Sequence, residues 1–436
     1  MSISKQVLEG SSLYMNRPPA LGGKEKVILK GTHQGKTAAF GVDESILSKH
    51  MLFVGGTGCG KTNLFYHFVN QLQKNMTSND VMIIFDSKGD FYSKFYRPDQ
   101  YVIGNSRQYR DKSLKWNIFK EVLADGWNGR DYMMNSSEIC GSLFEERMKN
   151  TTNAFFPNAA KDLLSSVLVC LIREVSKDKS FVNNLYNSEL RALLDGCDSK
   201  MLQGMLNSYP DMQSICSYIA GSGGQSQGVM AELFSVVREV FIGVFAAKGG
   251  FSMRNFVRTR GRKVLYIEYD LSIGSVLTPV YRLLFDMALK EALGRQNNQG
   301  NVYLICDEFK LLPHLQHIDD GVNFGRSLGV KIMAGLQSIE QLYEIYEESR
   351  GKNIAAGFSS IFAFKANDIT TRDYICNLFG KNILLERYTS TGAQYVEEKR
   401  IGQVVEDWDM AKLQVGEAIV CLPFSNPFQF RFDIYK

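Results

Sequence analysis

The sequence predicts an α/β fold in which a mostly parallel sheet is interrupted by an all-α insert. Short apolar runs alternate with segments whose apolar residues recur at helical spacing, which is typical of a parallel sheet covered by helices. Between about residues 128 and 225 this alternation stops and only helical periodicity remains. We therefore expect an irregular lead-in over 1–22, one α/β domain over 23–127 and 226–436, and the insert over 128–225.

The expected strands are apolar runs bounded by turn-forming residues. They cover residues 27–29, 38–42, 51–54, 81–85, 264–269, 302–306, 331–336, 360–365 and 417–421. The strongest helix of the insert is expected at Asn158–Val175, and the glycine-rich stretch 221–228 is expected to be a linker before the next helix.

Composition limits the class of protein but not its partner. The chain has 436 residues, 44% of them hydrophobic and 22% charged, with a net charge of +4. This mild basicity permits contact with nucleic acid without indicating it. The eight cysteines are scattered, with no C-x-x-C pair, which favours a reducing compartment. We see no signal peptide and no apolar run of membrane-spanning length, so we expect a cytoplasmic protein.

The segment GGTGCGKT fits the phosphate-binding pattern G-x-x-x-x-G-K-[ST] in full. An apolar strand precedes it and an amphipathic helix follows it, which is the context this loop requires. Its candidate nucleotide-binding residues are Gly55, Gly56, Thr57, Gly58, Cys59, Gly60, Lys61, Thr62 and the next residue, Asn63. Glycines let backbone N–H groups approach the phosphates, Lys61 reaches the β- and γ-phosphates, and Thr62 can bind Mg²⁺.

Asp307 and Glu308 follow the apolar run VYLIC. An aspartate there is expected to hold Mg²⁺ through water, and the glutamate to orient and deprotonate the attacking water. Because Glu308 stands beside the metal aspartate, the pair favours a hydrolase over a kinase. The sequence has no N-K-x-D element for guanine, so ATP is favoured over GTP.

Two further polar residues end expected strands. Asp86 is either a second acid near the phosphates or part of an ordinary polar turn in DSKGD. Gln337 follows KIMAGL and could touch the γ-phosphate or the attacking water, or simply begin a helix.

Several motifs in order resemble the TraD, TraG and TrwB-like coupling proteins of conjugation and type IV secretion, within the FtsK–HerA class. They are GGTGCGKT, IIFDSKGDF, WNIF, AFFPNAAKDLL, FSMRNFV, LICDEFKLLP, NFGRSLGVKIMAGLQSIEQLYEIY and LQVGEAIV, between about residues 50 and 420. The resemblance implies a RecA-like P-loop domain with an all-α insert. It also implies ATP-driven DNA translocation by a homo-hexamer whose partners are DNA, the relaxosome and the secretion channel.

By the same resemblance, Lys61, Thr62, Asp307, Glu308 and Gln337 would form the ATP site with Mg²⁺. The family also supplies a basic finger from one subunit to the next, for which Arg326, Lys365 and Arg372 are the candidates. Unlike typical members, this sequence shows no N-terminal membrane helices. We therefore expect a soluble member, a peripheral one recruited to the inner face of the membrane by a partner, or a shortened form of a longer protein.

Two other functions remain open at this point. An ATPase of the same build could hand over protein substrates, or a nucleotide-gated ring could turn over slowly as a scaffold. A phage packaging motor is less favoured, because it would usually add a nuclease domain and little sequence follows the last expected strand.

Overall fold

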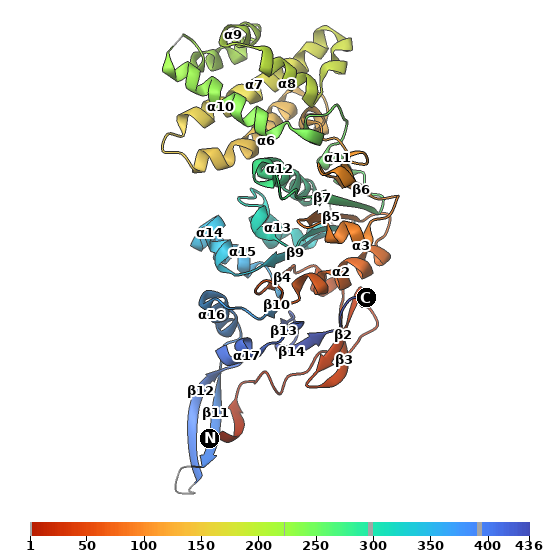
Figure 1. Cartoon of the computed structure of the whole chain (residues 1–436), viewed down its shortest axis with the longest axis vertical. Helices are drawn as coiled ribbons and strands as arrows, with labels where there is room; N and C mark the ends of the chain where they lie inside the picture. The colour runs from red at the N-terminus through yellow and green to blue at the C-terminus, as the bar shows by residue number, and fades with distance from the viewer. Residues whose placement is uncertain (1, 222, 295–299, 390–394) are drawn as a thin grey trace. The chain divides into compact units, whose positions relative to one another are not determined.

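The computed structural model describes residues 2–221, 223–294, 300–389 and 395–436, which form two compact units (Figure 1). Unit 1 comprises residues 1–82, 296–311 and 319–436, and unit 2 comprises residues 83–295 and 312–318. The predicted α/β class is confirmed. Unit 2 joins the predicted insert to neighbouring segments that were assigned to the α/β domain, so the predicted domain boundaries stay a prediction.

Unit 1 contains a sheet with the strand order β3-β2-β14-β13-β10-β4-β9-β8. These strands are Val27–His33 (β2), Lys36–Val42 (β3), Met51–Val54 (β4), Val302–Cys306 (β8), Val330–Leu336 (β9), Ser360–Phe364 (β10), Glu417–Cys421 (β13) and Phe428–Phe432 (β14). The neighbours β10, β4, β9 and β8 run parallel and are buried throughout. Strands covered on both faces need nearly unbroken apolar runs, and their carboxyl ends meet at one edge of the sheet.

Helix α2 (Lys61–Asn75) is the next element after β4, from which a short glycine-rich loop separates it. Its apolar residues Leu64, Phe65, Phe68, Val69 and Leu72 are buried, as their helical spacing predicts. The Phe53 ring of β4 lies 4.2 Å from Phe65 and 5.6 Å from Phe68 between centroids. These contacts fix the start of α2 over the end of β4.

The other helices of unit 1 are short. They are α1 (Glu44–Leu47), α14 (Glu340–Tyr346), α15 (Glu348–Ala356), α16 (Ile369–Leu378) and α17 (Asp407–Lys412). Two elements, β5 (Val81–Asp86) and α13 (Ile318–Phe324), each span a boundary between the units.

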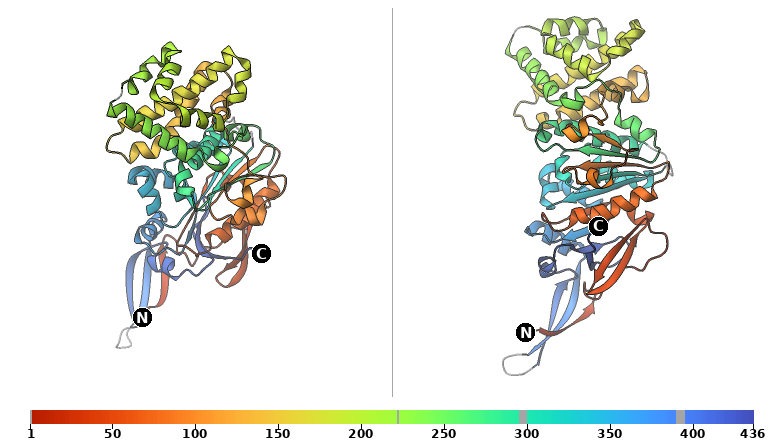
Figure 2. Two further views of the ribbon diagram at one scale, coloured as in Figure 1. Left: turned by 45° about the horizontal axis from the view of Figure 1, so that its top comes forward. Right: turned by 45° about the vertical axis from the view of Figure 1, so that its right-hand side comes forward.

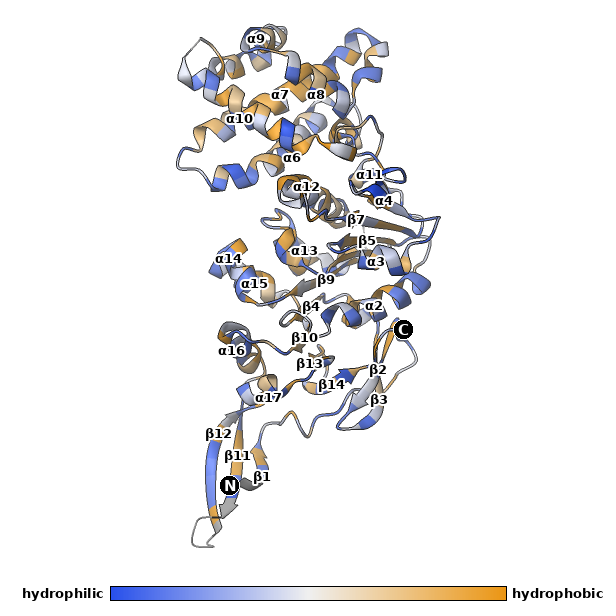
Figure 3. Ribbon diagram, in the orientation of Figure 1, coloured by the Kyte–Doolittle hydropathy of each residue, from blue (hydrophilic) through white to orange (hydrophobic). Residues whose placement is uncertain are grey.

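A second, three-stranded antiparallel sheet in unit 1 has the order β1-β11-β12. Its strands are Ser2–Glu9 (β1), Lys381–Thr389 (β11) and Tyr395–Gln403 (β12). The expected irregular lead-in is therefore wrong over residues 2–9. Hydrophilic and hydrophobic residues are mixed along these strands (Figure 3), so the segment lacks the apolar run used to recognise the buried strands.

Unit 2 contains the strand order β5-β7-β6, with β7 at Lys263–Glu268 and β6 at Tyr101–Ile103 running parallel. Its helices near these strands are α3 (Asp90–Phe95), α4 (Arg107–Arg110), α5 (Ile118–Val122), α11 (Met253–Arg258) and α12 (Gly274–Leu293). Strand β6 has three residues, too few to give a periodic signal in the sequence.

The remaining part of unit 2 is a cluster of helices (Figure 2). They are α6 (Gly129–Lys149), α7 (Phe155–Lys177), α8 (Asn187–Gly196), α9 (Ser199–Asn207) and α10 (Gly224–Val240). Among the described residues between 129 and 240, none belongs to a strand. Helix α10 begins at Gly224, inside the expected linker over 221–228. A Cβ at Gly228 would lie 2.5 Å from the Phe156 ring, so glycine at this position lets α10 and α7 approach closely.

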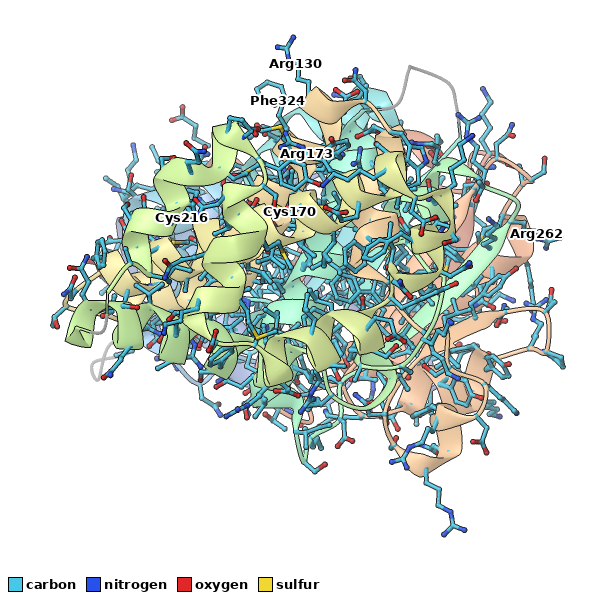
Figure 4. The ribbon with its side chains drawn as sticks, turned by 90° about the horizontal axis from the view of Figure 1, so that it is seen from above. Arg130, Cys170, Arg173, Cys216, Arg262 and Phe324 are labelled. Atoms are coloured by element: carbon cyan, nitrogen blue, oxygen red, sulfur yellow. The ribbon has the colours of Figure 1, made fainter. Side chains whose placement is uncertain are left out.

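Helix α7 is long and apolar enough to cross a membrane by length and composition, although the sequence was expected to contain no such segment. Within unit 2, however, 61% of its most apolar window is buried. Its exposed side carries Arg173, which forms an ion pair with Asp211 at 2.7 Å and is visible from above in Figure 4. This distribution is that of a core helix of a helical cluster.

Candidate nucleotide-binding site

The loop Gly55–Thr62 connects the carboxyl end of β4 to the start of α2. Gly60 has a φ of 112°, and a Cβ there would lie 3.0 Å from the backbone of Gly416. Gly58 has a φ of 74°, and a Cβ there would meet nothing within 4 Å. Both positions need glycine because their φ angles are positive. Gly60 also allows the close approach to Gly416, whereas Gly58 lies on the open side of the loop.

Neighbouring strands hold this loop in place. The Gly55 amide donates to the Leu336 carbonyl at 3.1 Å, and the Gly56 amide donates to the Lys365 carbonyl at 2.9 Å. Because Leu336 ends β9 and Lys365 follows β10, the loop is fixed by the two strands that flank β4. The loop is therefore tied to the sheet on both sides, which pre-organises its backbone.

The Lys61 side chain is buried under the loop. Its Nζ donates to the Gly55 carbonyl at 2.5 Å and to the Gly56 carbonyl at 3.2 Å, and lies 3.9 Å from Cys59 Sγ. Burial raises the pKa of the Cys59 thiol above its usual value. The thiol is therefore neutral, and the loop presents a single ammonium group where phosphates would add their charge.

Thr62 and Asp307 come together at the end of β8. Thr62 Oγ1 donates to Asp307 Oδ2 at 2.6 Å, and Asp307 is only 4% exposed. A hydroxyl and a carboxylate at this separation are oxygen donors of the kind that Mg²⁺ prefers. The residues present therefore fit a Mg²⁺ ion, with nucleotide phosphates and water completing its coordination.

Glu308 and Gln337 form a second pair at the same edge. Gln337 Nε2 lies 3.2 Å from Glu308 Oε2 and 3.4 Å from Oε1, so the amide donates to the carboxylate. The ends of the paired strands β8 and β9 lie close together here. A Cβ at Gly335 would lie only 2.1 Å from the Asp307 carbonyl oxygen. Glycine at 335 lets the two strand ends approach, and this approach places the amide beside the carboxylate.

Other residues of the predicted loop point elsewhere. Thr57 is exposed at the tip. Asn63 Nδ2 donates to the Asp433 carbonyl at 3.0 Å, and Asn63 Oδ1 accepts from the Tyr435 amide at 2.8 Å. Asn63 thus ties α2 to the C-terminal segment in this structure.

Asp86 belongs to unit 2, at the end of β5, and its carboxylate is 2% exposed. Its Oδ2 accepts from the Tyr92 amide at 2.8 Å within the turn that begins α3. Burial raises the pKa of Asp86, and backbone N–H groups of the turn partly offset this. These contacts describe a carboxylate that shapes its own turn, and a role beside the phosphates stays a prediction.

The three candidate basic residues lie in different surroundings. Arg372 forms an ion pair with Asp407 at 2.7 Å. Lys365 is exposed directly after β10, where its carbonyl holds the phosphate loop of its own chain. Arg326 is exposed just before β9, at the opposite end of that strand from Gln337.

The sequence did not predict the hydrogen bonds that hold the segment after Gln337 in place. Ser338 Oγ donates to Asp368 Oδ1 at 3.0 Å, and the Ile339 amide donates to Thr371 Oγ1 at 2.9 Å. These bonds join the start of α14 to the start of α16, next to Gln337. Serine, aspartate and threonine are common at helix starts, but this signal does not indicate that two helix starts meet.

A profile of the family described as the type IV secretion-system coupling protein DNA-binding domain matches residues 37–415. The coupling protein TraD of Escherichia coli (strain K12) is 21% identical over 308 residues, which cover 69% of this chain and 39% of TraD. The chain therefore matches less than half the length of that relative.

Two solved structures share the fold. The bacterial conjugative coupling protein TrwBdeltaN70, in its unbound monoclinic form, has a TM-score of 0.73 and 20% identity, covering 100% of this chain and 94% of that chain. The plasmid coupling protein TrwB in complex with ADP and Mg²⁺ has a TM-score of 0.70 and 20% identity, covering 100% and 95%.

Proposed function

Because the chain belongs to the type IV secretion-system coupling protein DNA-binding domain family, we propose that it hydrolyses ATP to move DNA as a coupling protein in conjugative transfer. The observation that carries this proposal is the meeting of two pairs at the carboxyl edge of the sheet. Thr62 lies beside Asp307, and Glu308 lies beside Gln337, next to a complete phosphate loop.

Each of these side chains has a distinct task in the proposed hydrolysis. The Lys61 ammonium group leaves the two loop carbonyls to which it donates in this structure and donates to the β- and γ-phosphates instead. Glu308 orients the attacking water and accepts its proton while the bond between the γ-phosphorus and the bridging oxygen breaks. Gln337 positions the Glu308 carboxylate and senses whether the γ-phosphate is present.

Thr62 and Asp307 would hold Mg²⁺. When bound, the ion would supply positive charge that stabilises the negative charge developing on the phosphate oxygens. ATP is proposed over GTP because the sequence lacks a guanine-reading N-K-x-D element.

The proposed working form is a homo-hexameric ring with DNA in its centre, in which a basic side chain from a neighbour completes each site. Arg326 is the best candidate for this role. Arg372 is engaged by Asp407. Lys365 lies beside the phosphate loop of its own chain, where its backbone carbonyl accepts from the Gly56 amide. Arg326 is exposed and lies at the far end of β9 from its own site, so its side chain is directed at another subunit's site or at solvent.

Mixing variants tests the finger. Arg326→Ala subunits and Lys61→Ala subunits should each be inactive alone, and their mixture should recover part of the hydrolysis because intact sites then form between subunits. If Arg326→Ala alone keeps wild-type turnover at concentrations where rings form, Arg326 is not the finger.

Measuring ATP hydrolysis with and without DNA tests the proposed function. The expected result is DNA-stimulated turnover that falls by roughly 10²–10⁴-fold in Glu308→Gln. Turnover that ignores DNA but responds to a secreted protein would favour a receptor for protein substrates. Assembled rings without turnover would favour a nucleotide-gated scaffold.

A further inference from the structure

Unit 2 carries an unusually basic segment outside the nucleotide site. Residues 88–115 contain seven basic and three acidic side chains, so this segment alone carries the +4 net charge of the whole chain. The basic residues are Lys88, Lys94, Arg97, Arg107, Arg110, Lys112 and Lys115, and every one of them is exposed. We call this set the basic edge.

The segment folds into one connected surface. The Tyr92 ring of α3 lies 4.5 Å from the Tyr109 ring of α4 and is stacked at 4.3 Å on Tyr96. Lys112 Nζ lies 5.6 Å from the Tyr96 ring centroid. Helices α3 and α4 are therefore held side by side, and the basic side chains that they carry are exposed.

The charges continue along strand β6, which ends the order β5-β7-β6. The Leu114 amide donates to the Val102 carbonyl at 2.8 Å, and the Gly104 amide donates to Ser113 Oγ at 3.1 Å. The chain between Lys112 and Lys115 thus runs against β6. Arg262, just before β7, projects from the ribbon in Figure 4 and adds a further exposed cation to this unit.

Three of these cations are not neutralised by an acidic side chain of the described residues. Within the described residues, Arg107, Lys112 and Lys115 form no ion pair, and Arg110 donates to the Asn105 carbonyl. An ordinary solvated face mixes both signs, whereas the excess here is one-sided. Such a surface attracts a polyanion, and the attraction does not depend on the sequence of that polyanion.

Two polyanions are available to a basic surface, nucleic acid and an anionic membrane. Amphipathic helices that insert into a membrane interface combine cations with exposed large apolar side chains that enter the lipid. Residues 88–115, all described, contribute no exposed large hydrophobic side chain. The observations favour nucleic acid.

We propose that the basic edge is a nucleic-acid contact surface that binds backbone phosphates without reading base sequence. The inference rests on the proposed function for the identity of the polymer, which is DNA. It goes further by assigning DNA contacts to α3, α4 and the segment along β6, none of which belongs to the phosphate loop. The surface would hold a strand through exchangeable phosphate contacts, as a moving polymer requires.

Binding of labelled single-stranded and duplex DNA tests the assignment. The variant Arg107→Ala/Lys112→Ala/Lys115→Ala removes three exposed cations, none of which belongs to the ATP site. The control Lys24→Ala/Lys30→Ala/Lys36→Ala removes three exposed lysines of unit 1, so its charge change is the same. Basal ATP hydrolysis reports that each variant is folded.

The expected result is at least about tenfold weaker DNA binding by the first variant near 50 mM salt, with wild-type binding by the control. The slope of log affinity against log salt should shrink by roughly two to three units, because each lost phosphate contact contributes about 0.9 for duplex DNA. Equal losses in both variants, or none in the first, would overturn the assignment.

Vesicles containing phosphatidylglycerol form the second arm. If the first variant loses vesicle binding but binds DNA as the wild type does, the basic edge is a membrane-binding surface and the proposal is refuted. The readout also separates this inference from the proposed function. If DNA binding depends on the basic edge but DNA does not stimulate hydrolysis, the basic edge is supported and the proposed motor function is contradicted. If DNA stimulates hydrolysis but its binding does not depend on the basic edge, the motor function is supported and the basic edge is refuted.

Discussion

Gln337 Nε2 lies 3.2 Å from Glu308 Oε2, although 29 residues separate the two in the sequence. The contact joins the strand end that carries the proposed catalytic carboxylate to the strand end that leads into α14. Helix α14 is in turn tied to α16 through Ser338 and Asp368. A change at the γ-phosphate that moves Gln337 would therefore reach two helices at once.

Replacing Gln337 with leucine removes the amide and keeps a side chain of similar size. We expect kcat to fall by about 10²-fold, as for loss of a transition-state hydrogen-bond donor, with little change in KM. Steady-state ATP hydrolysis measures both. A rise in KM at unchanged kcat would mean that Gln337 only helps to bind the nucleotide.

Thr62→Ala should weaken Mg²⁺-dependent nucleotide binding by at least about tenfold, because it removes a proposed metal ligand and the 2.6 Å bond to Asp307. Titration of a fluorescent nucleotide at varied Mg²⁺ concentrations measures this. Thr62→Ser keeps the hydroxyl and should bind nearly as the wild type does. Equal defects in the two variants would show that the methyl group, not the hydroxyl, matters.

Gly335→Ala should destabilise unit 1 and displace Asp307, because the new Cβ would lie 2.1 Å from the Asp307 carbonyl oxygen. The expected loss in the free energy of unfolding is about 1–3 kcal/mol, measured by denaturant titration, together with weaker Mg²⁺ binding. The matched control is Gly141→Ala in α6, where a Cβ meets nothing within 4 Å. That change should stabilise the helix by about 1 kcal/mol.

His50 should make folding stability depend on pH. Burial first, and the charge of Lys331 second, lower the pKa of His50 from 6.5 to about 3, and its Nδ1 accepts from the Ile332 amide at 3.1 Å. Because the folded pKa lies below the unfolded one, the unfolded chain binds the proton more readily. The stabilising contribution of neutral His50 is complete above about pH 6.5 and is lost as pH falls toward 3.

The expected slope from this histidine approaches about 1.4 kcal/mol per pH unit inside that window. His50→Asn is the matched variant, because its Oδ1 can accept the same amide without titrating and asparagine tolerates the positive φ of 56°. Denaturant unfolding at several pH values should show a shallower loss in the variant. Identical pH profiles would rule out this role for His50.

The sequence predicted the parts of the site that lie on buried parallel strands. Asp307, Glu308 and Gln337 each follow an apolar run, and parallel strands bring their carboxyl ends to one edge. The contacts that complete the site were not visible, because backbone carbonyls such as those of Leu336 and Lys365 carry no side-chain signal.

Other elements escaped prediction for different physical reasons. Strand β1 pairs with β11, near the other end of the chain, and its residues mix polar and apolar types, so neither periodicity nor proximity in sequence marks it. The basic edge was not recognised because its cations are spread among tyrosines and glycines over 28 residues without a continuous run. The packing of α3 on α4 through Tyr92 and Tyr109 places two of its charged segments side by side, and no sequence pattern marks this contact.

The most direct test of the central claim is ATP-dependent displacement of a third strand from a DNA triplex by the full chain. We expect release that requires hydrolysable ATP and Mg²⁺ and is abolished by Glu308→Gln, a variant that still binds DNA. Release by Glu308→Gln at the wild-type rate, or no release by wild-type rings that hydrolyse ATP, would contradict the account of this protein as a DNA-moving motor.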